Sequence, residues 1–267
     1  WIIAASFVLL WMGGCRVETT ETVTPAPLIS ISIQPSAPSL VPGTSLQLEA
    51  IGTYENGATN NITSSVVWQS ADPGIVAVDA SGLAAASTAG STTVTVRLGA
   101  ISSSTVITSS PLVSIALSPA DPTIAGGTGV GFTATGTLLN GAVQNLTSFA
   151  TWTSSNTAVA NVTSGGLANA LPSLPGAATI TASFGTITGT TVLTSADVLS
   201  ISVTPLTASI VLGASQQFTA IAGLAGGFTQ DLTSSASWTS SSPTIAAIGN
   251  PSASPGLAVS VTPGTTA

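Results

Sequence analysis

Histidine is absent from this sequence of 267 residues, and cysteine occurs once, at Cys15. The lack of histidine excludes Ser-His-Asp and Cys-His catalysis and most zinc or copper sites. Charged residues make up 4% of the chain, nine acidic against two basic, for a net charge of −7. A charge this small and acidic provides no basic patch for nucleic acid or anionic lipid. We therefore expect no nucleic-acid partner.

Acidic side chains remain candidates for general acid–base catalysis and for calcium binding between domains. They are scattered, mostly near turns, with no repeated pair; they include Glu49, Glu55, Asp72, Asp79, Asp121, Asp197 and Asp231. Asp121 and Asp197 lie near the expected domain junctions, but each is a lone carboxylate, and calcium takes several oxygen ligands. We expect solvated turn residues, with calcium between domains as the alternative. No catalytic, cofactor-binding or metal-binding residues are expected, and no enzymatic activity.

Long apolar runs are missing after Met12, where none approaches the ~20 residues of a membrane-spanning helix. Apolar residues, 44% of the chain, instead alternate with serine and threonine. This period of two is typical of half-buried strands, and glycine, proline and asparagine interrupt it roughly every eight to twelve residues. The pattern predicts an all-β protein built from antiparallel sandwiches.

One motif occurs three times: asparagine or aspartate, any residue and threonine, with a tryptophan five residues after the threonine. Its copies end at Trp68, Trp152 and Trp238, which are 84 (152 − 68) and 86 (238 − 152) residues apart. A repeat of this length is a whole domain. We expect the three tryptophans to be structural core residues between two sheets, with a sugar-stacking platform as the alternative.

Other features recur at matching offsets. A proline follows the first strand of each copy. A tight turn follows the second strand, at Asn56-Gly57, Asn140-Gly141 and Gly226-Gly227. The alternation predicts that Ile29, Ile31 and Ile33 face the core together. The corresponding residues of the other two copies are Val113, Ile115 and Leu117, and Leu199, Ile201 and Val203. Strands containing Val106 and Val192 are expected to close the first two copies, and each tryptophan is expected on a strand. The third copy stops at Ala267, and we expect it to lack its last two strands.

The order of strand and proline, Asn-Gly turn, Asn/Asp-x-Thr, Trp-x-Ser, Val-Ala-x-Val, Gly-Leu and a late glycine resembles the bacterial immunoglobulin-like domain, group 2, of the invasin and intimin type. The resemblance covers about residues 28–267. It implies a sandwich without a disulfide bond and a use in stalks of surface adhesins and in spacers. The expected domains are 28–110, 111–196 and an incomplete 197–267.

The first residues have the features of an export signal. Residues 1–14 are mostly apolar, which indicates part of a signal peptide. Met12-Gly13-Gly14-Cys15 resembles the lipobox of bacterial lipoproteins, and this resemblance implies lipidation at Cys15 and an outer-membrane or surface location. A plain secretory signal or a short anchor is the alternative. Residues 15–27, rich in threonine, glutamate and proline, predict a solvated linker.

The favoured function is a non-enzymatic, membrane-anchored stalk or spacer in adhesion or in the display of a distal domain. One alternative is that the repeats themselves bind a glycan, a matrix protein or a receptor. Another is that they are accessory modules of a polysaccharide-degrading enzyme whose catalytic domain follows Ala267.

Overall fold

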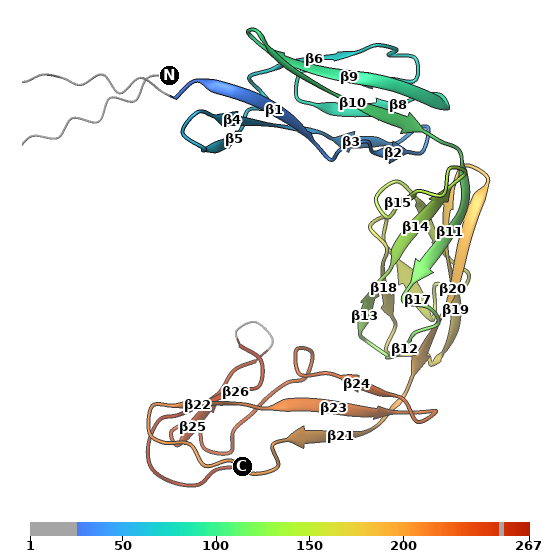
Figure 1. Ribbon diagram of the computed structural model, residues 1–267. Coiled ribbons are helices and arrows are strands. Elements are labelled where there is room, and N and C mark those ends of the chain that lie inside the picture. The colour runs from blue at the N-terminus through green and yellow to red at the C-terminus, as the bar shows by residue number, and fades with distance from the viewer. Residues whose placement is uncertain (1–25, 251–253) are drawn as a thin grey trace, which may run out of the picture.

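The computed structural model describes residues 26–250 and 254–267. Within these residues, every regular secondary-structure element is a β-strand. They form three sandwiches that follow one another along a curve (Figure 1). Sandwich 1 comprises residues 28–109, sandwich 2 residues 112–196 and sandwich 3 residues 198–267. Within the described residues, no helix has the length and apolarity needed to cross a membrane. The expected signal peptide, Cys15 and residues 15–25 of the expected linker lie outside these residues.

Sandwich 1 is built from three sheets in which the chain crosses repeatedly between layers. One sheet is β1 (Leu28–Gln34), β4 (Glu49–Tyr54) and β5 (Thr59–Asn61). The second is β2 (Ser39–Leu40), β10 (Ile101–Ser109), β9 (Gly90–Leu98) and β6 (Val67–Ser70). The third is β3 (Ser45–Gln47), β8 (Leu83–Ala86) and β7 (Val76–Val78). All pairings are antiparallel except β2 with β10, which is parallel.

Sandwich 2 repeats this topology strand for strand. Its sheets are β11 (Leu112–Ser118), β14 (Thr133–Leu138) and β15 (Val143–Asn145); β12 (Thr123–Ala125), β20 (Ile187–Ala196), β19 (Gly176–Phe184) and β16 (Thr151–Ser154); and β13 (Gly129–Gly131), β18 (Leu167–Ala170) and β17 (Ala160–Val162). The repeated topology confirms the predicted all-β architecture of tandem immunoglobulin-like sandwiches.

The described residues of sandwich 3 form two of the three sheets. They are β21 (Val198–Thr204), β23 (Thr219–Leu224) and β24 (Thr229–Asp231); and β22 (Ser215–Gln217), β26 (Leu257–Ser260) and β25 (Ala246–Ile248). Its described residues contain no counterpart of β9 and β10. The expected strand at Trp238 is therefore wrong, because in the other copies that strand pairs with β9 or β19. Ile201 is 56% exposed for the same reason, because no counterpart of β10 packs on β21 among the described residues.

The first strand of each sandwich corrects the predicted alternation. Ile31 and Ile33 are buried, but Ile29 is 56% exposed. The pairing of β1 with β4 shifts between Leu28 and Ser30, a β-bulge that places one extra residue on β1 and turns Ile29 outward. Sandwiches 2 and 3 contain the same shift, and their corresponding residues, Val113 and Leu199, are exposed as well.

The last strand contains Val106 and Val192, as predicted, and turns both of them outward. Ile107 and Leu193, one residue later, are fully buried instead. Directly paired antiparallel residues share one face, and Ile107 pairs with the buried Thr92 of β9. Two adjacent apolar residues leave this choice open in the sequence, and the partner strand decides it.

Candidate functional site at the domain junctions

The predicted core tryptophans lie inside their sandwiches. Trp68, Trp152 and Trp238 are 9%, 8% and 8% exposed, so their rings offer no open face on which a sugar could stack. The ring of Trp152 lies 6.5 Å from that of Phe132, with 28° between the planes. The three rings are therefore packed as core side chains, and a binding site has to be sought on the surface.

Acidic residues do not converge on a site in the described part of the chain, where no three acidic, histidine or cysteine side chains are grouped as metal ligands. Asp121 accepts a hydrogen bond of 2.9 Å from the backbone of Val192 within its own sandwich. The backbone carbonyl of Asp197 accepts from Ala225 at 2.9 Å. Both expected calcium candidates thus take part in local backbone structure, and neither joins a ligand set.

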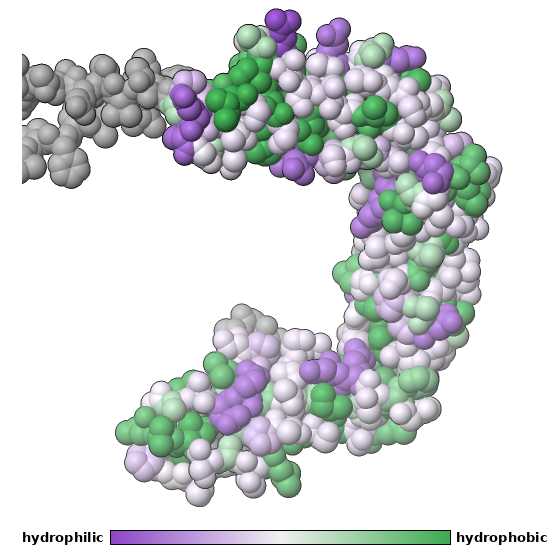
Figure 2. All heavy atoms as spheres, in the orientation of Figure 1, coloured by the Kyte–Doolittle hydropathy of each residue, from purple (hydrophilic) through white to green (hydrophobic). Residues whose placement is uncertain are grey.

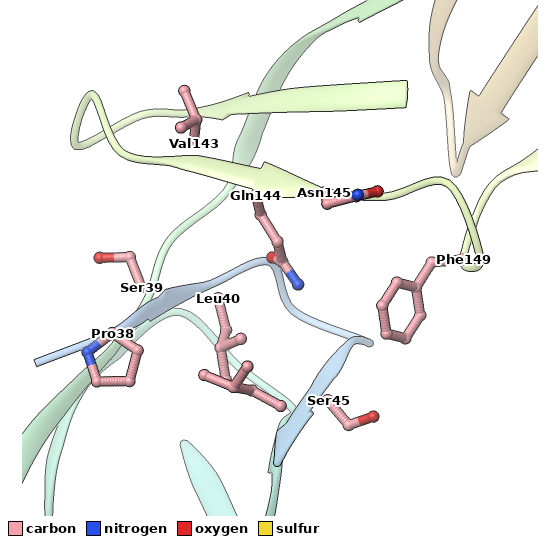
Figure 3. A pocket seen from close by; sticks show the side chains of 9 residues that line it. Pro38, Ser39, Leu40, Ser45, Val143, Gln144, Asn145 and Phe149 are labelled. Atoms are coloured by element: carbon pink, nitrogen blue, oxygen red, sulfur yellow. The ribbon is translucent and has the colours of Figure 1, made fainter. Parts of the chain in front are cut away.

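A groove of about 390 Å³ lies where sandwich 1 meets sandwich 2 (Figure 3). It is lined by Pro38, Ser39, Leu40, Ser45, Leu46, Val143, Gln144, Asn145 and Phe149. None of these side chains is charged, and the groove therefore lacks the groups needed for acid–base chemistry. Gln144 points from β15 across the groove to the chain between β2 and β3 (Figure 3).

The hairpin turn that precedes β15 also forms hydrogen bonds across the junction. Asn140 Nδ2 donates to Ser39 Oγ at 3.0 Å, and the backbone N–H of Asn140 donates to Ser110 Oγ at 3.3 Å. Asn140 was predicted from the sequence as a turn residue, and its contact with the neighbouring domain was missed. Gln144 was missed as well, although the third copy has glutamine at the same position, Gln230.

The outer face of sandwich 2 has rows of paired threonine and serine residues. Thr153 of β16 pairs with Thr181 of β19, which pairs with Thr190 of β20. A parallel row is formed by Thr151, Ser183 and Thr188. These rows place hydroxyl and methyl groups on strands without a charged residue. Figure 2 likewise shows a surface of mainly intermediate hydropathy, with strongly hydrophilic and hydrophobic residues scattered over it.

Residues 28–109 match the model of the bacterial Ig-like domain (group 2). Sandwich 1 is such a domain. This match confirms the family resemblance read from the sequence motif, and sandwich 2 shares the topology of this Ig-like domain.

Comparisons with known proteins cover most of the chain. Over 241 residues it is 37% identical to ice-binding protein 1 of Shewanella frigidimarina (strain NCIMB 400), which covers 87% of this chain and 27% of that protein. A crystal structure of the S-layer protein rSbsC aligns with a TM-score of 0.31 at 17% identity, covering 81% of this chain and 33% of the other. A tandem Ig pair of titin aligns with a TM-score of 0.24 at 10% identity, covering 62% and 95%. The chain thus spans about a quarter of the ice-binding relative.

Proposed function

We propose that this chain is a non-enzymatic spacer of the bacterial cell surface, in which Ig-like domains hold a distal binding module away from a lipid-anchored end. The observation that carries the proposal is the tandem arrangement itself: sandwiches 1 and 2 each have a core cluster of their own, and only Ser110 and Pro111 separate β10 from β11. Successive sandwiches with such short connections each add about 35 Å to the length of the chain along its curve, given ~3.3 Å per strand residue.

The relative with 37% identity supports a binding module as the cargo, because it is named an ice-binding protein and the present chain corresponds to 27% of it. The anchor is proposed at Cys15, through the lipobox-like sequence before it. In this assignment the partners are a membrane, reached through the lipid, and a solid or polymeric surface, reached by the distal module.

Two measurements test the spacer. Metabolic labelling with a radioactive fatty acid should mark the protein, and Cys15→Ser should abolish the label and release the protein from the membrane fraction. Deletion of residues 111–196 should shorten the particle, measured along its curve by electron microscopy, by about one domain length, ~35 Å. Membrane retention of Cys15→Ser would refute the anchor, and an unchanged length along the curve would refute the spacer.

A second candidate function is favoured by the threonine rows of sandwich 2. Regular hydroxyl and methyl groups on an uncharged face suit direct contact with a flat lattice such as ice, the ligand named for the relative. Inhibition of ice recrystallisation by residues 1–267 tests this function. Thr181→Lys, at the centre of one row, should abolish the inhibition, whereas Thr93→Lys on sandwich 1 should preserve it. A chain without inhibition leaves the spacer as the function and refutes direct ice binding.

A further inference from the structure

Gln144 bonds sandwich 2 to a turn of sandwich 1. Its Oε1 atom accepts a hydrogen bond of 2.7 Å from the backbone N–H of Val41. Its Nε2 atom donates to Thr44 Oγ1 at 2.9 Å, and that hydroxyl donates to the carbonyl oxygen of Val41 at 2.7 Å. One amide side chain thus meets both the backbone and the side chain of a single turn in the preceding domain.

Gln230 makes the same contacts at the next junction. Its Oε1 atom accepts from the backbone N–H of Ala125 at 2.6 Å, and its Nε2 atom donates to Thr128 Oγ1 at 3.2 Å. Thr128 Oγ1 donates to the carbonyl oxygen of Ala125 at 2.7 Å, as Thr44 does to Val41. The atoms and their roles are identical, 84 to 86 residues further along the chain.

The turn also inserts an apolar residue into the following domain. Val41 is 2% exposed and belongs to the core cluster of sandwich 2. Ala125 is 1% exposed and clusters with Ala222, Leu224 and Leu232 of sandwich 3. Because these positions are dry, their backbone N–H groups need a partner, and the glutamine supplies it.

Sandwiches 1 and 3 show that the fold of a single domain does not require the glutamine and the threonine of this contact. The residue of sandwich 1 that corresponds to Gln144 is Asn60, which is exposed. The residue of sandwich 3 that corresponds to Thr44 is Ala214, yet its turn still forms, with a 3.0 Å bond from Ala214 N–H to Val211 O. Val211, the counterpart of Val41, is 77% exposed. Glutamine and threonine therefore occur together where two described domains meet.

We propose that Gln144 and Gln230 are orientation-setting residues of a repeated interdomain joint, whose partner is the turn of the preceding domain at Val41–Thr44 or Ala125–Thr128. Domains within one chain ordinarily move relative to each other unless their interface holds them. Here the short connection, the inserted apolar residue and the bidentate amide fix each pair, so the chain is a strut of set curvature. The joint sets the angle between domains in the same way whatever the chain anchors or displays.

Distance measurements between spin labels test the joint in the full chain. Labels are attached at Ser64→Cys and Ser164→Cys, on sandwiches 1 and 2, in a Cys15→Ser background. The unsubstituted joint should give one narrow distance distribution. Gln144→Ala should widen it about twofold or more, since interdomain motion is then unrestrained. Asn60→Ala, at the matched position, which makes no interdomain contact within the described residues, should leave the width unchanged.

Two further variants keep the test decisive if Gln144→Ala disturbs folding. Gln144→Asn shortens the side chain to that of Asn60 and should widen the same distribution. Gln230→Ala, with labels at Ser164→Cys and Ser234→Cys, should widen the distribution across the second junction alone. Circular dichroism verifies that each variant keeps its strands. A broad distribution in the unsubstituted chain, widths unchanged in the folded glutamine variants, or equal widening in Asn60→Ala would overturn the proposal.

Discussion

The indole N–H of Trp152 donates a hydrogen bond of 2.9 Å to the backbone carbonyl of Thr147, five residues earlier. The hydroxyl of Thr147 accepts a bond of 3.0 Å from Ala134 N–H, and its own N–H donates to Asn145 Oδ1 at 2.9 Å. One threonine therefore joins the turn, the opposite strand and the buried ring. The same bonds occur at Thr63 and Thr233, so the repeated motif fixes the position of the tryptophan ring in the core.

Thr147→Val keeps the shape of this side chain but removes its hydroxyl. The N–H of Ala134, a fully buried residue, then loses its acceptor, which should destabilise sandwich 2 by about 1–3 kcal/mol. Hydrogen exchange of residues 112–196 in the full chain measures the change. Thr153→Val, on the exposed face, is the control and should be nearly neutral. Equal exchange rates in the two variants would contradict this role of the hydroxyl.

Trp152→Ala removes the largest side chain of the sandwich 2 core. The lost burial and the remaining cavity should destabilise that domain by about 3–5 kcal/mol, a large share of the stability of one domain. Val192→Ala, a truncation at a 39% exposed position of the same domain, should have a much smaller effect. Thermal unfolding followed by calorimetry resolves the transition of sandwich 2. An unchanged transition in Trp152→Ala would disprove the structural role assigned to the ring.

Gly166 lies against the same ring, with φ of +79°. A Cβ atom there would lie 2.6 Å from the Phe132 carbonyl oxygen and 2.9 Å from Cζ2 of Trp152. Gly166→Ala should therefore add the repulsion of an overpacked core, about 1–3 kcal/mol, to the strain of a left-handed alanine. Gly141→Ala has a φ of +82° with no atom within 4 Å of the new Cβ, so it measures the strain alone. Equal losses of melting temperature would show that the contact does not matter.

The sequence predicted the elements that repeat and involve local chemistry. Trp152 and Thr147 were recognisable because their spacing recurs in three copies, and a recurring large apolar residue indicates a core. The sandwich class followed from the period of two in the first strands. Such features depend on neighbouring residues, which one sequence displays.

Features set by a distant partner were not predictable in this way. The outward turn of Ile29 depends on one extra residue relative to β4, and the choice between Val106 and Ile107 depends on the register with β9. Gln144 has an unremarkable position in its own hairpin, and its role appears only when the turn at Val41 is brought to it. The outline of the fold is thus local information, whereas register and domain contacts are not.

The third copy differs from the others in having Asp231 where they have asparagine. Hydrogen bonds to the Asp231 carboxylate hold its pKa below the ordinary value; the larger contribution comes from the Thr233 hydroxyl and the smaller from the Thr233 backbone N–H. A lowered folded-state pKa stabilises the fold fully above the unfolded-state pKa, and this contribution is lost as the pH falls through the folded value. The effect is small, because the group is exposed and screened. Sandwich 3 should therefore weaken as the pH falls below ~4, the ordinary range of aspartate.

Asp231→Asn should remove this part of the pH dependence, because the amide keeps an acceptor oxygen without titrating. The indole N–H resonance of Trp238, bonded to Thr233 O at 3.0 Å, reports on the motif during an acid titration. Asp79 of sandwich 1, whose pKa is lowered by hydrogen bonds from Ser81 and Leu83, should keep its own acid response and serves as the internal control. An identical titration of the Trp238 resonance with and without Asp231 would show that another group controls the acid response of the third domain.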